Sequence, residues 1–194
     1  MRLLAYSKHL LPTIFLALAV LSSPGLVRGA DGDVVVRVMP FEGSYRQGEE
    51  ITVEVWVENV AQLYGADISL RFDPTRFSVL DADPIRPGVQ ITPSSSLLSP
   101  DMVIRREADN GSGQVWYAVT QLNPSAPVSG SGMLFSFRLQ MKLAGLDVVR
   151  VESQQLATRD GDLIQANTRD ARYWISVNGE SPKIAIFSLV PVGH

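Results

Sequence analysis

The sequence predicts an all-β fold in which two sheets pack face to face. Short segments of alternating apolar and polar residues follow one another from residue 33 onward, separated by Gly, Pro, Asn and Asp. The clearest is YGADISLRFDP, residues 64–74, in which a period of two places the apolar side chains on one face of a strand. No segment after residue 30 keeps a helical period over three turns. Many short strands with frequent turns are typical of a β-sandwich.

The expected strands differ in length and in how much of each is apolar. Residues 34–39 are rich in Val, residues 51–58 alternate cleanly, and residues 133–143 form the longest run, with Phe135 and Leu143 at the two ends of its apolar face. In chain order the expected strands are residues 34–39, 51–58, 64–73, 77–80, 103–106, 114–120, 133–143, 148–152, 163–165 and 173–177.

Turn residues punctuate these strands. Asn110-Gly111 suits a tight turn with positive φ, although Asn110-Gly111-Ser112 also matches a glycosylation sequon. Asp160-Gly161 is expected to be a hairpin turn, because it lacks the further oxygen ligands of a calcium loop. Asp73-Pro74 is expected to cap a single turn, and residues 84–100 and 122–132 are expected to be loops.

Composition and charge narrow the class of protein. The chain has 194 residues, of which 45% are hydrophobic and 19% charged, values typical of one folded domain with appendages. The net charge is −3 and no segment concentrates Lys and Arg, so we expect neither nucleic-acid binding nor a polybasic membrane patch. The chain has no cysteine, which excludes a Cys nucleophile, a lipid-modified Cys anchor and thiolate metal sites.

The first 30 residues have the pattern of an export signal. Arg2 and Lys8 make the start basic, and the apolar core of residues 10–21 is shorter than the about 20 residues that a membrane-spanning helix needs. We expect residues 1–30 to be a signal peptide, the mature chain to start near Ala30 or Asp31, and the protein to be secreted or held at the cell surface. An uncleaved anchor is the alternative.

The rest of the chain divides into one domain and a tail. Residues 31–179 are expected to form the sandwich, and residues 180–194 a C-terminal tail. Within the tail, residues 183–192 are apolar but too short to cross a membrane, so no stable membrane insertion is expected. They are expected to add an edge strand or to dock on the sandwich.

The sequence offers few residues that could act in catalysis. The only histidines are His9, inside the predicted signal, and His194, so a Ser-His-Asp triad and a typical zinc site are not expected. Paired carboxylates of the glycosidase kind would need one acid in an apolar pocket, and no acidic residue has such surroundings in the sequence. We therefore expect no catalytic residue, no metal site and no enzyme activity.

Three segments resemble the cohesin family, the sandwich modules of cellulosomal scaffolds. They are residues 48–83, with the strand of residues 64–74 at their centre, residues 128–145, and residues 151–165. Together the three segments span nearly the whole mature chain, and the resemblance rests on their order and spacing. The resemblance implies a nine-stranded jelly-roll sandwich and a dockerin partner that serves polysaccharide breakdown. Dockerins are small helical domains that carry calcium themselves, so no cofactor is expected on this chain.

The resemblance also implies a contact surface on one flat sheet face, with Asp67 at the position that helps to hold the partner's helix. Ser69 shares that face by alternation, and Trp116 points outward if its neighbours point inward. Thr120 and Gln121, at the end of the same strand, are expected at the rim. Gly65 departs from the family, which often has a hydrogen-bonding side chain there.

Two other interpretations stay open. A carbohydrate-binding module of the same superfamily could use Trp56, Trp116 and Tyr117 to stack on sugars of a polysaccharide. A structural or adhesive sandwich could instead add its apolar tail as a strand to a neighbouring molecule.

Overall fold

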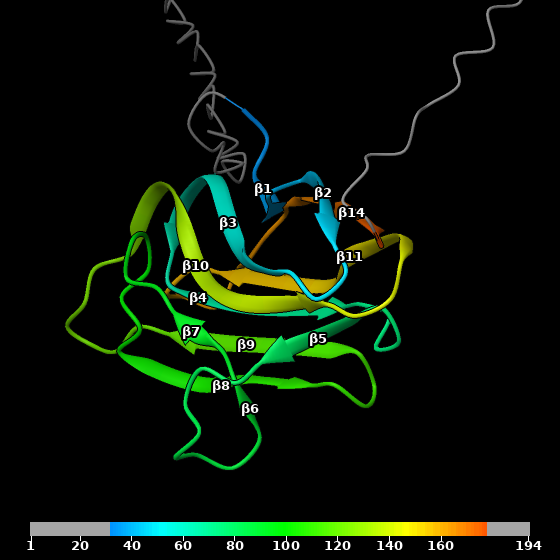
Figure 1. Cartoon of the computed structure of the whole chain (residues 1–194). Helices are drawn as coiled ribbons and strands as arrows, with labels where there is room; N and C mark the ends of the chain where they lie inside the picture. Colours follow the sequence, from blue (N-terminus) through cyan, green and yellow to red (C-terminus); the bar gives the residue numbers. More distant parts are fainter. Residues whose placement is uncertain (1–31, 178–194) are drawn as a thin grey trace, which may run out of the picture.

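The computed structural model describes residues 32–177, and these form two β-sheets packed face to face (Figure 1). The first sheet contains β1 (Val35–Met39), β3 (Glu50–Leu63), β5 (Phe77–Leu80), β7 (Thr92–Pro93), β10 (Val128–Met141) and β13 (Asn167–Arg169). The second contains β2 (Glu42–Arg46), β4 (Gly65–Arg71), β6 (Val89–Gln90), β8 (Met102–Asp109), β9 (Gln114–Thr120), β11 (Gly145–Ala157), β12 (Leu163–Ile164) and β14 (Ala171–Ser176). The all-β prediction is confirmed.

The strand orders are those of a sandwich with long-range pairing. The first sheet runs β13-β1-β3-β10-β5 with β7 also on β10, and the second runs β2-β14-β11-β4-β9-β8-β6 with β12 also on β11. Ten strands have four or more residues. Because β1 and β2 are two halves of one run that changes sheet at Pro40 and Phe41, these ten amount to nine, as the jelly-roll prediction requires.

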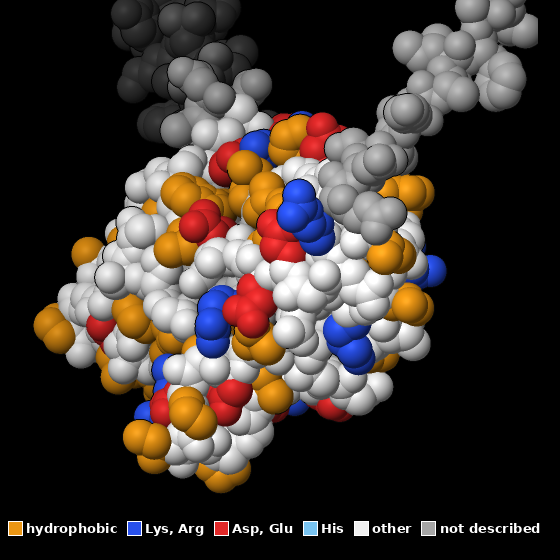
Figure 2. Space-filling model, in the orientation of Figure 1, with side chains coloured by type: hydrophobic (Ala, Val, Ile, Leu, Met, Phe, Trp, Pro, Cys, Tyr) orange, Lys and Arg blue, Asp and Glu red, His pale blue; other side chains and the backbone are white. Residues whose placement is uncertain are grey.

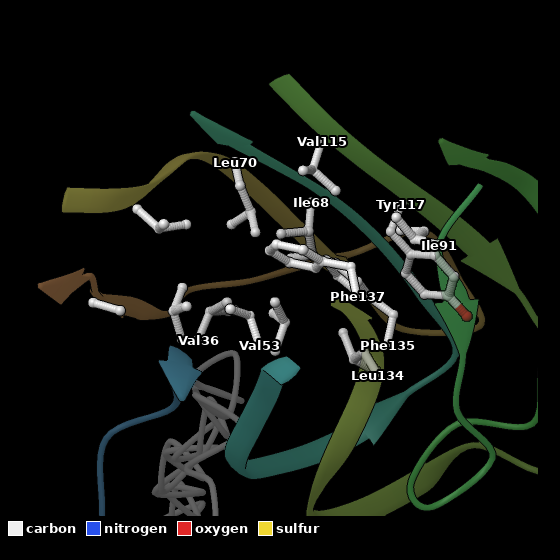
Figure 3. Packing of buried hydrophobic residues seen from close by; sticks show 14 of the residues in the cluster. Val36, Val53, Ile68, Leu70, Ile91, Val115, Tyr117, Leu134, Phe135 and Phe137 are labelled. Atoms are coloured by element: carbon white, nitrogen blue, oxygen red, sulfur yellow. The ribbon is translucent and has the colours of Figure 1, made fainter. Parts of the chain in front are cut away.

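The core lies between the sheets and consists of alternate residues of the long strands. Ile68, Leu70 and Val115 of the second sheet meet Phe135 and Phe137 of the first (Figure 3). All five are at most 2% exposed, so burial matches the period of two in the sequence. The apolar area that these and the other core residues bury supplies most of the stabilisation of the fold.

The longest strand differs from its prediction. Residues 133–143 were expected, but β10 covers Val128–Met141, and Leu143, expected on the core face, is 49% exposed just past its end. Register shifts near Gly130 and Gly132 let β10 bend while it stays paired with β3. The short strands β2, β6, β7 and β13 have no apolar alternation and were missed. Two of them, β6 and β7, lie within residues 84–100, which were expected to be a loop.

The turn at Asn110-Gly111 forms, but positive φ falls elsewhere. Gly113 has φ of 72°, whereas Asn110 and Gly111 are not in the left-handed region. The loop has four residues between the paired Asp109 and Gln114, and Gly113 N closes it on Asp109 O at 2.9 Å, so the left-handed residue is the last one of the loop. The Asn110 side chain turns inward: its Oδ1 accepts from Val79 N at 2.7 Å and its Nδ2 donates to Val79 O at 2.9 Å. The prediction of positive φ at Asn110-Gly111 is therefore wrong.

The two other turn predictions are confirmed. Gly161 has φ of 88° in the turn that Thr158 N closes on Asp162 O at 3.0 Å. Asp73 caps its turn, because its Oδ1 accepts from Thr75 N at 2.8 Å.

Residues 1–31 and 178–194, which include the predicted signal peptide and the whole tail of residues 180–194, lie outside the described residues. Between Gly32 and Val177 there is no helix long and apolar enough to cross a membrane. Acidic and basic side chains are interspersed over the face that Figure 2 shows, without a continuous basic area.

Candidate functional site

The strand that contains Asp67 lies in the middle of the second sheet, between β9 and β11 (Figure 1). The outer surface of β11, β4, β9 and β8 is called the β4 face below. Strand register aligns its outward residues in rows. From one end to the other the rows are Met102, Thr120, Gly65, Ala157 and Leu163; Arg105, Ala118, Asp67 and Gln155; Glu107, Trp116, Ser69 and Ser153; and Asp109, Gln114, Arg71 and Arg150.

Asp67 is exposed near the centre of this face. Its chain neighbours Ala66 and Ile68 are 5% and 0% exposed, so the core holds the strand and directs Asp67 outward. Its cross-strand neighbours are Ala118 and Gln155. Within residues 32–177 its carboxylate takes part in no ion pair or side-chain hydrogen bond, so a partner can use both oxygens.

Ser69 shares the face as predicted, but it is only 7% exposed. Its hydroxyl lies 2.9 Å from the hydroxyl of Ser153 on β11. The two serines therefore satisfy each other and make a low, polar floor beside Asp67.

Trp116 points outward, as parity predicted, because Val115, Tyr117 and Val119 are all at most 2% exposed. Its ring is covered by a neighbouring side chain. The Arg105 guanidinium lies 3.8 Å from the ring centroid in a cation–π contact. Arg105 is held there by Glu107, whose Oε1 accepts from Nε at 2.6 Å.

A charged cluster that sequence reasoning missed closes one end of the face. Arg71 and Glu152 form an ion pair at 2.7 Å, and Gln114 Nε2 donates to Glu152 Oε2 at 2.9 Å. The hydrogen bond from Gln114, followed by those from Arg71, lowers the pKa of Glu152. The three residues are far apart in sequence and on three strands, so no local pattern could have revealed them.

The opposite end of the face is apolar. Met102 and Leu163 are 48% and 63% exposed at the two ends of a row whose middle members, Gly65 and Thr120, are small. The Thr120 hydroxyl donates to the backbone oxygen of Gln121 at 3.2 Å.

Gln121 is placed differently from its expected rim position. It is 5% exposed, and its backbone N donates to Tyr64 O at 2.9 Å. Its side-chain Oε1 is buried without a hydrogen-bond partner among the described residues. The strand end folds inward here, so Gln121 offers little surface to a partner.

The three aromatic residues considered for sugar stacking do not form a platform. Trp56 lies on β3 in the first sheet, where its Nε1 donates to Glu54 Oε2 at 2.8 Å, whereas Trp116 lies on the second sheet. Tyr117 is 1% exposed inside the core. A flat polysaccharide needs several exposed rings on one face, and this set provides one.

No group of three or more His, Asp or Glu side chains that could hold a metal occurs in the part of the chain that the structure describes. The shifted carboxylates, Asp73, Asp81, Asp101, Asp109 and Glu152, all have a lowered pKa, with hydrogen bonds from neighbouring groups as the main cause. A general acid needs the opposite shift.

Comparisons with solved structures agree with this architecture. A non-cellulosomal cohesin from the hyperthermophilic archaeon Archaeoglobus fulgidus is 16% identical with a TM-score of 0.55, and the match covers 75% of this chain and 92% of that chain. A type I cohesin–dockerin complex from Clostridium thermocellum contains a match of 13% identity and TM-score 0.60 over 74% and 92% of the two chains. The sixth cohesin of scaffoldin B from Acetivibrio cellulolyticus, solved with a Cel5 dockerin, gives 13% identity and 0.58 over 75% and 100%.

No curated protein matches the chain in sequence. The Cohesin domain family matches residues 41–168, which include β2 to β12 and the whole β4 face. That match covers 128 of the 194 residues, and so the chain belongs to the cohesin domain family.

Proposed function

We propose that this cohesin domain is a non-catalytic module that binds a protein partner of the dockerin class through the β4 face. The observation that carries the proposal is Asp67: an exposed carboxylate without a partner among residues 32–177, on a strand that the core holds rigidly. Membership of the family and cohesin–dockerin complexes among similar folds support the choice of partner.

The shape of the face suits a helix. Along β4 the outward residues Gly65 and Ser69 are small, as are Ala118 on β9 and Ser153 on β11, whereas Trp116 on β9 and Gln155 on β11 are larger. Larger side chains stand at the sides, and Met102 and Leu163 are four strand spacings apart, about 19 Å at the usual separation of 4.8 Å. A helix with its side chains is about 10–12 Å wide and would fit between them.

The chemistry of the face gives a bound helix a direction. Met102 and Leu163 would contact apolar side chains at one end, while Arg71 and Glu152 satisfy each other at the other end. Between them Asp67 can accept hydrogen bonds from Ser or Thr hydroxyls, from a cationic side chain or from amides at a helix N-terminus.

A binding role outside the cell agrees with the rest of the chain. The pattern of residues 1–30 favours export, and a dockerin-bearing partner would bring the enzyme activity, with its own calcium, to a polysaccharide. Amino-terminal sequencing of protein recovered from the culture medium tests export. A chain that begins near residue 30 is expected, and one that begins at Met1 contradicts it.

Binding through Asp67 is tested by calorimetric titration of a calcium-loaded dockerin module encoded in the same genome. Asp67→Ala should weaken binding by about 1–2 kcal/mol, because a central contact is lost. It should change the free energy of unfolding by no more than about 0.5 kcal/mol, because the side chain is exposed.

Two controls separate binding from folding. Asp33→Ala removes an exposed carboxylate that lies before β1 of the other sheet, and it should leave affinity unchanged. Leu70→Ala truncates a residue that is 0% exposed and should cost about 2–5 kcal/mol of stability. Equal affinity of wild type and Asp67→Ala would show that the face is not the contact surface.

A further inference from the structure

The edge strand β2 has backbone groups that no described strand uses. Within residues 32–177, β2 pairs only with β14 and is the last strand of its sheet. Arg172 N donates to Phe41 O at 2.8 Å, and Gln47 N donates to Ser176 O at 2.9 Å. Since backbone groups of successive residues point to opposite sides of a strand, the odd-numbered residues face β14 and the even-numbered residues face the open edge.

Part of that edge is already satisfied. Arg46 N donates to Glu49 Oε2 at 2.8 Å, and Arg46 O accepts from Glu49 N at 3.0 Å. Glu42 and Ser44 therefore remain as the residues whose N–H and C=O groups face outward along β2. An open strand edge is a template for another strand.

Apolar side chains lie on both sides of this edge. On the outer face, register places Leu146 and Trp174 in one row with Ser44, and Leu146 is 50% exposed. Phe41, directly before β2, is 55% exposed. On the inner face the half-buried Tyr45 ring makes an edge contact with Tyr173, at 5.6 Å between centroids. A strand with apolar side chains on both faces would cover these surfaces.

A segment of this kind follows β14 a few residues later in the sequence. Residues 183–190, KIAIFSLV, are apolar on both faces of an extended strand and lie outside the described residues. Val177, the last described residue, follows β14 at the end where β2 also finishes, because the two strands are parallel. The six residues from Val177 to Lys183 can span about 20 Å, whereas the far side of β2 is two strand spacings, about 10 Å, from β14.

The topology leaves one place for a returning strand. β14 is paired with β2 on one side and with β11 on the other, so it cannot pair with the segment that follows it. We propose that residues 183–190 pair antiparallel with the open edge of β2 in the same molecule. They would bond to Glu42 and Ser44 and cover Tyr45 and Trp174. This site is separate from the β4 face and does not depend on the proposed partner.

Amide hydrogen exchange of the full-length chain, followed by NMR, tests the proposal at single residues. The Ser44 amide should exchange about two orders of magnitude more slowly than in an unfolded chain, because a strand bonds to it. In the double variant Ile184→Pro with Phe187→Pro, Ser44 should lose this protection. Residue 184 is an even position and residue 187 an odd one, so their N–H groups would point to opposite sides of the strand. Proline has no N–H, so one of the two substitutions removes a group that faces β2, whichever residues of the segment pair with it.

The Tyr45 amide, which faces β14, is the internal control and should stay protected in every variant. Val192→Pro, beyond the segment, should leave Ser44 protected. Rapid exchange of Ser44 in the wild type would overturn the proposal. Protection that disappears on dilution would overturn it as well, because it would show that the strand comes from a second molecule.

Discussion

At the scale of single residues, the polar side chains of Asp67 and Asn110 differ in direction: one points to solvent and the other into the protein. Asp67 is directed away from the core by its neighbours and stays open to a partner. Asn110 turns inward and takes the place of a strand residue, with one hydrogen bond to Val79 N and another to Val79 O. The sequon Asn110-Gly111-Ser112 therefore contains a structural amide.

Asn110→Asp should destabilise the domain, because the carboxylate keeps the acceptor for Val79 N but loses the donor to Val79 O. The unsatisfied carbonyl and its repulsion by the carboxylate should cost about 1–3 kcal/mol, measured by urea unfolding at pH 7.

Ser112→Ala is the matched control, because it destroys the sequon and leaves the amide intact. It removes the exposed hydrogen bonds that the Ser112 hydroxyl donates to Asp109 Oδ2, at 2.7 Å, and to Gln114 Oε1, at 3.4 Å, and should cost no more than about 1 kcal/mol. A larger effect for Ser112→Ala than for Asn110→Asp would contradict a structural role of the amide.

At the scale of strands and turns, the turn between β8 and β9 lies close to the end of β4 and is bonded to it. Phe72 N donates to Gly113 O at 2.8 Å, which joins the end of β4 to the turn. Gly113 has φ of 72°, and a Cβ built there would collide with the Phe72 carbonyl oxygen. The position therefore needs glycine for both conformation and space.

Gly113→Ala should cost more than about 2 kcal/mol, because left-handed strain adds to a clash with backbone that cannot move aside. Gly161→Ala is a matched comparison, since Gly161 has φ of 88° but open space around it. It should cost about 1–2 kcal/mol from strain alone. Thermal unfolding of both variants measures the difference, and equal losses would mean that the contact with Phe72 contributes nothing.

At the scale of the whole molecule, the direction of the pKa shifts sets the pH range in which the domain is most stable. The shifted aspartates, Asp73, Asp81, Asp101 and Asp109, have pKa values below the ordinary 3.8, chiefly because neighbouring groups donate hydrogen bonds to them. Burial raises the pKa of Tyr117 to about 12, and it raises the pKa of Tyr173 as well.

Stability should fall at both ends of the pH scale. A carboxyl group with a lowered folded pKa stabilises the fold above its unfolded pKa of 3.8, and that contribution is lost as pH falls further. A tyrosine with a raised pKa stabilises the fold below its unfolded value of 10.0, and its contribution is lost as pH rises toward 12.

Melting temperatures should therefore be nearly constant from about pH 5 to 9 and decrease below about pH 4 and above about pH 10. Tyr117→Phe should weaken the decrease at alkaline pH, since phenylalanine does not ionise. An unchanged alkaline profile in that variant would exclude Tyr117 as a cause.

The sequence by itself determined the alternation of the strands and hence the core. Burial on one side of a strand requires apolar residues at every second position, so Ile68, Leu70, Tyr117 and Phe137 could be assigned without coordinates. The outward direction of Asp67 and Trp116 follows from the same local rule. The turn at Asp160-Gly161 could be predicted because glycine tolerates the positive φ that it requires.

Only the tertiary structure decided which outward residues meet. Neighbours across strands depend on register, and register depends on long-range hydrogen bonds and on bulges such as the shift between Val151 and Ser153. That is why the cluster of Glu152, Gln114 and Arg71, and the burial of Gln121, could not be read from local pattern. A period of two assigns each residue to a face, whereas the pairing of strands far apart in the chain assigns its neighbours.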